Sequence, residues 1–533
     1  MFKDKLSSIS DKPVKNVINI GPFTFNARIA WLIGSSFFIG SEAFICSAAQ
    51  PRIKTHNASQ AVEQSHKAVQ LKPNNEIAWT DLGEALQMGG DLSSAQQTQE
   101  NALQNNPKLT EARLGLALVK DDQGKTAEVI PELRTTAEEG KSASAYFSLG
   151  DSLYEKKDFI GSEAAYRQSI ALNPNNDKAH FHLARALYYQ GKLEDSLASC
   201  QTAIRINPNN DKAHNGLGVV LSDQGKLEDA IASYQTAIRI NPNLADSHYN
   251  LGLALYDQGK LEDAIASYKT AIRINPNDNM AHNGLGNALS DQGKLDGAIA
   301  SYQTVIRINL NYADAHYGLG LALQAQGKLD GAIASYQTAI RINPNYADAH
   351  YGLGLALYDQ GKLDGAIASY QTVIRINPNY ADAHYGLGLA LYDQGKLDGE
   401  IASYQTAIRI NPNLEQAHYN LGLALYEQGK LDGAIASYQT AIRINPNYAL
   451  AHNNLGLALS DQGKLEDAIA SYQTAIRINP NLAQAHFNLG LIFKQQGKKS
   501  DAIAQFQKAR PLYQQKCDTK TVADIDRLIQ ELS

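Results

Sequence analysis

Apolar residues recur along the chain in two short stripes, and the pair of stripes repeats every 34 residues. In the copy that begins at Ala245, the first stripe consists of His248, Leu251, Gly252 and Leu255. The spacing i, i+3, i+4, i+7 places these side chains on one face of an α-helix. The second stripe consists of Ala264, Ile265, Tyr268, Ala271 and Ile272. The pattern therefore predicts two consecutive amphipathic helices in every repeat.

The residues between the stripes predict where each helix ends. Positions 1–34 of a repeat are counted from Ala245, so that Gly259 is position 15 and Pro276 is position 32. Glycine adopts the left-handed conformation that ends a helix, so the first helix is expected to stop at Gly259. The second helix is expected to stop before Pro276, because the residue before a proline is disfavoured in the helical region. Asn277 is then the expected N-cap of the next helix.

The sizes of the recurring residues predict how the helices pack. Gly252 and Ala264 are small and allow the two helices to approach closely. Tyr268 is large and is expected to fill the gap between neighbouring helix pairs, with the small Ala271 where the next pair docks. One pair cannot bury its own apolar face, whereas a stack of pairs can.

Leu, Gly, Ala, an aromatic residue, Ala and Pro recur at positions 7, 8, 20, 24, 27 and 32. This set resembles the tetratricopeptide repeat (TPR) signature, and the copy from Glu76 carries the Trp of that signature as Trp79. Repeats begin at 76, 110, 143 and 177, and then every 34 residues to 483, after a half repeat at about 57–75. The resemblance implies an all-α fold, a right-handed superhelical solenoid of antiparallel helix pairs. The repeats are similar to the TPR region of O-linked N-acetylglucosamine transferases, and no catalytic domain is expected after them.

Composition changes along the chain suggest six segments. They are a basic leader (1–28), a hydrophobic signal or anchor segment (29–49), a divergent half repeat plus three repeats (50–176), nine near-identical repeats (177–482), the last repeat (483–516) and a C-terminal cap helix (517–533). The apolar run Ile29–Ile39, followed by Ser47 and two alanines, resembles a secretory signal peptide. If Glu42 is tolerated, residues 29–49 form a membrane anchor instead. We therefore expect an exported (periplasmic or extracellular) or membrane-anchored protein, with the cytoplasm as the alternative.

The first helix of each repeat carries the candidate binding residues. The resemblance implies that first helices line a concave groove, with ligand contacts at positions 2, 5, 6, 9, 12 and 13. Spacing independently places positions 5, 9 and 12 on one side of the helix, away from the core stripe. The candidate partner-binding residues are Tyr249, Asn250, Leu253, Tyr256, Tyr317, Tyr351, Leu355, Tyr358, Asp359, Tyr385, Leu389, Tyr392, Asp393, Tyr419, Asn420, Tyr426, Asn454 and Asn488.

Two interpretations of these residues remain open. Tyr at position 5 usually accompanies Tyr at position 12, and Asn at position 5 accompanies Ser at position 12, so the side chains could simply pack across adjacent repeats. Alternatively, they line a groove for an extended chain, with aromatic anchors of the kind enriched at interfaces; a glycan stacked on the tyrosines is a third option. Acidic residues at position 13 would favour a partner with Lys or Arg near its apolar residues. The family's clamp for a C-terminal carboxylate needs Lys at position 5 and Asn at position 9, but position 5 is mostly Tyr or Asn here and position 9 mostly Leu, so this mode is disfavoured. The TPR region of O-linked N-acetylglucosamine transferases carries a ladder of Asn at position 6, which glycines interrupt in this chain.

Composition and motifs argue against other functions. The formal net charge is −6, so we expect no nucleic-acid partner. Histidine recurs at position 4, but packed helices lie roughly 8–10 Å apart and metal–nitrogen bonds are about 2 Å, so these histidines are expected to pack and not to bind metal. No phosphate loop, zinc spacing or nucleophile motif is present. We expect no cofactor and no enzyme activity.

The sequence as a whole predicts a monomeric, non-catalytic scaffold that binds other proteins or extended peptides in its concave groove. One alternative is a structural spacer without a specific groove ligand. Another is a targeting or adaptor subunit of a protein-modifying complex of the glycosyltransferase type. Possible membrane association would run through residues 29–49.

One residue conflicts with the packing pattern. Glu400 occupies position 20, where the neighbouring repeats have Ala. An unpaired buried carboxylate costs several kcal/mol, so Glu400 must be protonated, paired or turned outward. We expect a local weak point here, which Glu400→Ala should relieve.

Overall fold

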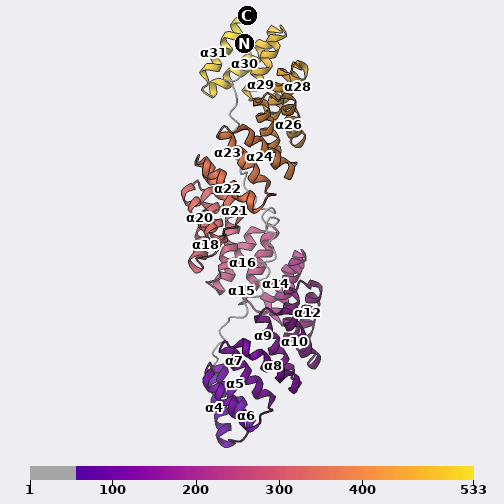
Figure 1. Ribbon diagram of the computed structural model, residues 1–533, viewed down its shortest axis with the longest axis vertical. Coiled ribbons are helices and arrows are strands. Elements are labelled where there is room, and N and C mark those ends of the chain that lie inside the picture. The colour runs from indigo at the N-terminus through magenta and orange to yellow at the C-terminus, as the bar shows by residue number, and fades with distance from the viewer. Residues whose placement is uncertain (1–55) are drawn as a thin grey trace. The chain divides into compact units, whose positions relative to one another are not determined.

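The computed structural model describes residues 56–533, and within this range the chain folds into 28 helices and no strands (Figure 1). The all-α fold predicted from the sequence is confirmed. The leader (1–28) and the hydrophobic segment (29–49) lie outside the described residues. Between residues 56 and 533, no helix has the length and apolar character needed to cross a membrane.

Thirteen helix pairs account for most of these helices. The first helices are α5 (Glu76–Gly89), α7 (Thr110–Asp122), α9 (Ala143–Glu155), α11 (Asp177–Tyr189), α13 (Asp211–Asp223), α15 (Ala245–Asp257), α17 (Asn279–Asp291), α19 (Ala313–Ala325), α21 (Ala347–Asp359), α23 (Ala381–Asp393), α25 (Glu415–Glu427), α27 (Ala449–Asp461) and α29 (Ala483–Gln495). The second helices are α6 (Leu92–Asn105), α8 (Thr126–Gly140), α10 (Phe159–Leu172), α12 (Leu193–Ile206), α14 (Leu227–Ile240), α16 (Leu261–Ile274), α18 (Leu295–Ile308), α20 (Leu329–Ile342), α22 (Leu363–Ile376), α24 (Leu397–Ile410), α26 (Leu431–Ile444), α28 (Leu465–Ile478) and α30 (Lys499–Gln515). Helices α4 (His56–Leu71) and α31 (Thr519–Leu532) flank the pairs.

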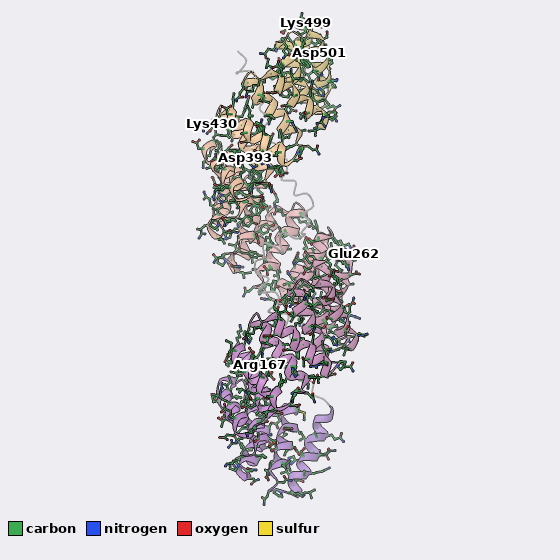
Figure 2. The ribbon with its side chains drawn as sticks, turned by 90° about the vertical axis from the view of Figure 1, so that its right-hand side faces the viewer. Arg167, Glu262, Asp393, Lys430, Lys499 and Asp501 are labelled. Carbon is green, nitrogen blue, oxygen red and sulfur yellow. The ribbon has the colours of Figure 1, made fainter. Side chains whose placement is uncertain are left out.

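The described chain forms two compact units, residues 56–308 and residues 309–533. Within each unit every helix packs against the helices before and after it in the sequence. Most first helices also contact the first helix of the adjacent repeat in the same unit. The predicted stacking of helix pairs is therefore confirmed. Charged side chains such as Glu262, Lys430 and Lys499 lie exposed on the surface (Figure 2).

The helix ends follow the glycine prediction but not the asparagine prediction. Helix α15 stops two residues before Gly259, whose φ of 74° is the left-handed conformation expected there. The N-cap of α17 is Asp278, whose carboxylate accepts hydrogen bonds from the next helical N–H groups. The prediction of Asn277 was therefore wrong by one residue. Asn277 instead donates its backbone N–H to the side chain of Asn275 at 3.3 Å, in the turn that precedes the cap.

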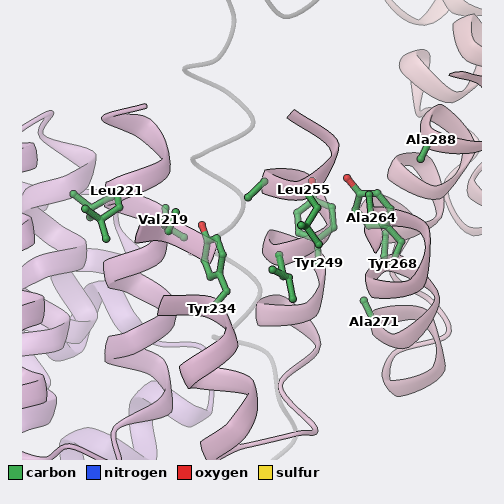
Figure 3. Close-up of a cluster of buried hydrophobic side chains, with 14 of the residues drawn as sticks. Val219, Leu221, Tyr234, Tyr249, Leu255, Ala264, Tyr268, Ala271 and Ala288 are labelled. Carbon is green, nitrogen blue, oxygen red and sulfur yellow. The ribbon is translucent and has the colours of Figure 1, made fainter. Parts of the chain in front are cut away.

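The large tyrosine at position 24 fills the space between repeats, as predicted (Figure 3). Tyr268 on α16 is only 1% exposed. A Cβ atom placed on Gly252 of the same repeat would lie 2.8 Å from its ring, and one on Gly284 of the next repeat would lie 2.7 Å away. Two glycines therefore flank the Tyr268 ring, as they do at Tyr336 and Tyr370, and their lack of a side chain permits the close approach.

Position 4 links each first helix to the turn before it. The Nε2 atom of His248 lies 3.0 Å from the carbonyl oxygen of Pro242, which can only accept a hydrogen bond, so Nε2 donates. The same contact recurs at His180, His214, His282, His316, His350, His384, His418, His452 and His486. In the first repeat, Trp79 donates its Nε1–H to the Pro73 carbonyl at 2.8 Å. Histidine thus replaces tryptophan as a hydrogen-bond donor in the packed turn.

Candidate functional site

The tyrosines at position 5 belong largely to the packing between repeats. The Tyr351 ring lies 5.9 Å from the ring of Tyr370 at position 24 and 5.3 Å from that of Tyr380 at position 34. The other position-5 tyrosines pack on their own position-24 tyrosine with ring centroids 5.9–6.0 Å apart; they are Tyr249, Tyr317, Tyr385 and Tyr419. Tyr249 and Tyr419 are buried and the others are half-buried. These rings therefore belong mainly to the packing of the stack, and the half-buried ones keep only part of their surface accessible.

The asparagines at position 6 hold adjacent repeats together. Asn420 donates its side-chain amide to the Tyr385 hydroxyl at 3.0 Å, and Asn454 donates to the Tyr419 hydroxyl at 3.0 Å. In repeats whose neighbour has Asn at position 5, the acceptor is the Asn side chain; the pairs are Asn250 with Asn215 and Asn488 with Asn453. Because these amides already bond within the stack, we assign them to packing. The leucines at position 9 offer little exposed surface to a partner, since Leu355 is buried and Leu253 and Leu389 are half-buried.

Positions 12 and 13 form a ladder of hydrogen bonds between repeats. Tyr256 donates its hydroxyl to the Asp291 carboxylate at 2.6 Å, and Tyr426 donates to Asp461 at 2.5 Å. Tyr188 with Asp223 and Tyr358 with Asp393 are further rungs. In the repeat with Tyr317, Gln324 takes the place of tyrosine and donates to Asp359 at 3.4 Å. Position 12 of each of these repeats thus contacts position 13 of the next.

The ladder carries exposed negative charge. Asp359, Asp393, Glu427 and Asp461 are exposed. At position 12, Tyr188 is buried, and the half-buried tyrosines are Tyr256, Tyr358, Tyr392 and Tyr426. Partial burial raises the pKa of Asp257 to about 6. Burial likewise raises the pKa of Asp291 to about 6, although the Tyr256 hydrogen bond acts in the opposite direction. Sequence reasoning named both positions but missed their pairing, because the pairing joins different repeats.

Charge differs between the two helices of the five repeats that begin at residues 313, 347, 381, 415 and 449. The five first helices α19, α21, α23, α25 and α27 contain no Lys or Arg. They carry eight carboxylates: Asp314, Asp348, Asp359, Asp382, Asp393, Glu415, Glu427 and Asp461. The second helices of these five repeats each carry an exposed Arg at position 29 in their last turn, such as Arg375. We call the exposed surface at positions 12 and 13 of these five first helices the acidic face.

A different cluster, which was not predicted from the sequence, lies in the unit of residues 56–308. The Arg185 guanidinium, at position 9, lies 4.4 Å from the centre of the Tyr154 ring. Nearby, the Asp151 carboxylate accepts from the Tyr166 hydroxyl at 2.6 Å and lies 2.7 Å from Nδ1 of His182. Position 9 is Leu in most other repeats, so this departure was visible but had no predicted consequence. Among residues 56–533, no group of three or more His, Cys, Asp or Glu side chains could hold a metal ion.

Family comparison agrees with the repeat geometry. A model described as TPR repeat matches nine overlapping segments between residues 184 and 497, which is more than half of the chain. The chain belongs to the tetratricopeptide repeat family. Two further tetratricopeptide repeat models match residues 143–176 and 165–198. A comparison with curated protein sequences gives no significant match.

Several solved structures are similar to this TPR protein. The crystal structure of YrrB, described as a TPR protein with an unusual peptide-binding site, is 25% identical, covers 35% of this chain and 95% of its own, and has a TM-score of 0.31. The crystal structure of MamA is 30% identical, with 31% of this chain and 97% of its own covered and a TM-score of 0.30. The APC/C hetero-tetramer Cut9–Hcn1 matches at 14% identity over 88% of this chain and 98% of its own, with a TM-score of 0.41.

Proposed function

We propose that this TPR protein is a non-catalytic scaffold whose acidic face binds an extended protein segment that carries Lys or Arg among apolar residues. The TPR family assignment supports a role in protein–protein interaction. The observation that carries the choice of partner is the charge of α19, α21, α23, α25 and α27, which hold eight carboxylates and no basic residue. Complementary charge steers association and selects partners.

The spacing of the acidic face favours an extended partner. Its exposed carboxylates recur once per 34-residue repeat, at Asp359, Asp393, Glu427 and Asp461. A single exposed ion pair contributes only about 0.2–1 kcal/mol. A useful affinity therefore requires contacts to several successive repeats, which an extended segment can make. The half-buried tyrosines at position 12 keep part of their surface accessible to apolar side chains between the basic ones.

Selection from a random 12-residue peptide display library on the full chain tests this proposal. We expect the recovered peptides to contain two or more Lys or Arg residues and to bind less tightly as salt is raised, since salt screens exposed charges. The triple variant Asp359→Asn, Asp393→Asn, Asp461→Asn should weaken binding, because it removes three exposed charges while keeping hydrogen-bond acceptors.

A matched control changes three carboxylates on second helices of the same unit, where they accept hydrogen bonds from glutamines. Asp364, Asp398 and Asp432 at position 18 accept hydrogen bonds from Gln394, Gln428 and Gln462 at 2.6–2.9 Å. Changing all three to Asn removes the same charge from the second helices and should leave peptide binding intact. Equal loss in both triple variants would contradict the assignment to the acidic face. If the library yields no binder, the alternative function, a structural spacer without a specific groove ligand, is favoured.

A further inference from the structure

One rung of the ladder is built differently from its neighbours. Tyr392 at position 12 should pair with Glu427 at position 13 of the next repeat, as Tyr426 pairs with Asp461. Glu replaces Asp at this rung, and no hydrogen bond joins the pair in the described structure. At the same place Glu400 occupies position 20, where Ala366 and Ala434 stand in the adjacent repeats.

Glu400 is buried without a partner. It is 1% exposed on α24, although its neighbours at position 20 are alanines in the tightly packed part of the repeat. Within residues 56–533, the carboxylates of Glu400 and Glu427 have neither a hydrogen-bond nor an ion-pair partner. Burial, followed by the charge of Glu427, raises the pKa of Glu400 to about 8. Burial also raises the pKa of Glu427.

The two carboxylates and the Tyr392 hydroxyl interact electrostatically. Burial, then Glu427 and Glu400, raise the pKa of Tyr392 to about 12. Glu400 therefore lies within electrostatic reach of positions 12 and 13 on α23 and α25, which belong to the acidic face. The cluster contains two acids and a phenol, and no basic group lies on the first helices around it.

We propose that Glu400, Glu427 and Tyr392 form a subsite that receives one basic side chain, Arg or Lys, of the bound segment. This inference rests on the proposed function and names the contact that anchors the segment. An uncompensated buried carboxylate is costly, and a cation placed against it offsets that cost more than at an exposed rung. A guanidinium can bond two carboxylates at once through its fork of N–H groups. The subsite therefore sets where along the array the basic residue of the partner lies.

The chain offers a variant that removes the subsite without disturbing the repeat. Glu400→Ala restores the residue found at position 20 in adjacent repeats, so this variant should fold at least as well as the wild type. Glu466→Ala is the charge-matched control, because Glu466 is an exposed carboxylate on α28 in the same unit. Circular dichroism melting of the full-length variants checks that both are folded.

Thermodynamic cycles between peptide and protein test the contact. Peptides recovered from the display library are resynthesised with each Arg in turn replaced by citrulline, or each Lys by acetyl-lysine, both of which are uncharged. We expect one peptide position at which neutralisation weakens binding to the wild type about tenfold but weakens binding to Glu400→Ala less than twofold. Glu466→Ala should behave like the wild type at that position.

The outcomes separate this inference from the proposed function. In one outcome, basic peptides bind, and neutralisation of each basic position weakens binding to the wild type and to Glu400→Ala by the same factor. The subsite is then wrong, and binding on the acidic face stands. A library without binders overturns both. A third outcome would assign the cluster to an inorganic cation and overturn the subsite. In that case millimolar Ca²⁺ or Mg²⁺ stabilises the wild type but not Glu400→Ala, and no peptide position shows a different effect of neutralisation in the two proteins.

Discussion

The Tyr256 hydroxyl donates a 2.6 Å hydrogen bond to the carboxylate of Asp291, which lies 35 residues later and in the next repeat. The same relationship joins Tyr188 to Asp223 and Tyr426 to Asp461. Each bond ties the end of one first helix to the end of the next and fixes a carboxylate at the surface. Stability between repeats and negative charge on the first helices therefore come from the same residues.

Tyr256→Phe should weaken the stack locally. It removes the donor that favours the ionised form of Asp291, so the pKa of Asp291 should rise above about 6. We expect a loss of about 1 kcal/mol in local stability, larger at pH 8 than at pH 5. Amide hydrogen exchange in α15 and α17 measures this opening locally, which suits an array that need not unfold in one step. Tyr392→Phe is the control, since its hydroxyl bonds no carboxylate; an equal loss there would contradict the ladder.

The sequence predicted the repeat fold because each part of it rests on local spacing. The 34-residue period, the helix-ending glycines and the large tyrosine at position 24 all follow from residues within one repeat or at its border. The N-cap was placed one residue early, because Asn277 and Asp278 are both capping residue types. Only the geometry of the turn decides between them.

The candidate site was harder to predict because its contacts join different repeats. Positions 5 and 12 fall on the same side of a first helix, so spacing could not separate the packed Tyr351 from the more accessible Tyr358. The asparagines at position 6 were considered as ligand contacts, whereas Asn454 bonds Tyr419 in the preceding repeat. Glu400 was recognised as a misfit from its position alone, but its proximity to Glu427 depends on how α24 and α25 stack.

Glu400→Ala should stabilise the protein, and the gain should grow with pH. The carboxylate takes up a proton on folding, because its pKa is about 8 in the folded protein and near 4.5 otherwise. Stability of the wild type relative to the alanine variant therefore falls as pH rises from 4.5 to 8 and is constant above that. We expect a difference of about 3 kcal/mol at pH 8.5 and much less at pH 5.

Melting temperatures of both variants across this pH range measure the difference. Glu400→Gln, which removes the charge and keeps the size, should follow the alanine variant in its pH dependence. A gap between wild type and Glu400→Ala that does not change with pH would show that Glu400 destabilises through its size alone.

Gly352→Ala should destabilise the stack of residues 309–533. Its Cβ would lie 2.8 Å from the ring of Tyr336, which is fully buried and cannot move aside. Overpacking of this kind costs about 1–3 kcal/mol. Gly331→Ala is the matched control, because its Cβ would meet only the end of the flexible Leu323 side chain at 3.2 Å. It should be neutral or stabilising by up to about 1 kcal/mol, as expected for Gly replaced by Ala within a helix. Urea unfolding of the two variants distinguishes these outcomes.

His418→Trp should be tolerated, and His418→Phe should not. Nε2 of His418 donates to the Pro412 carbonyl at 3.1 Å, and an indole N–H can make the same bond, as Trp79 does. Phe lacks a donor, so we expect a loss of about 1 kcal/mol. Burial lowers the pKa of His418, so the wild type should also lose stability relative to the Trp variant as pH falls below about 6.5. Thermal melts at pH 7.5 and pH 5 test both statements, and equal stability of all three proteins would contradict them.

The binding of a library-selected basic peptide, followed by fluorescence anisotropy, tests the central claim most directly. The comparison is between wild type, the triple Asn variant at Asp359, Asp393 and Asp461, and the triple Asn control at Asp364, Asp398 and Asp432. We predict that the first triple variant raises Kd about tenfold at low salt, since three exposed ion pairs are lost, and that the control leaves Kd unchanged. A Kd that is the same for all three proteins, or that rises equally in both variants, would contradict binding on the acidic face.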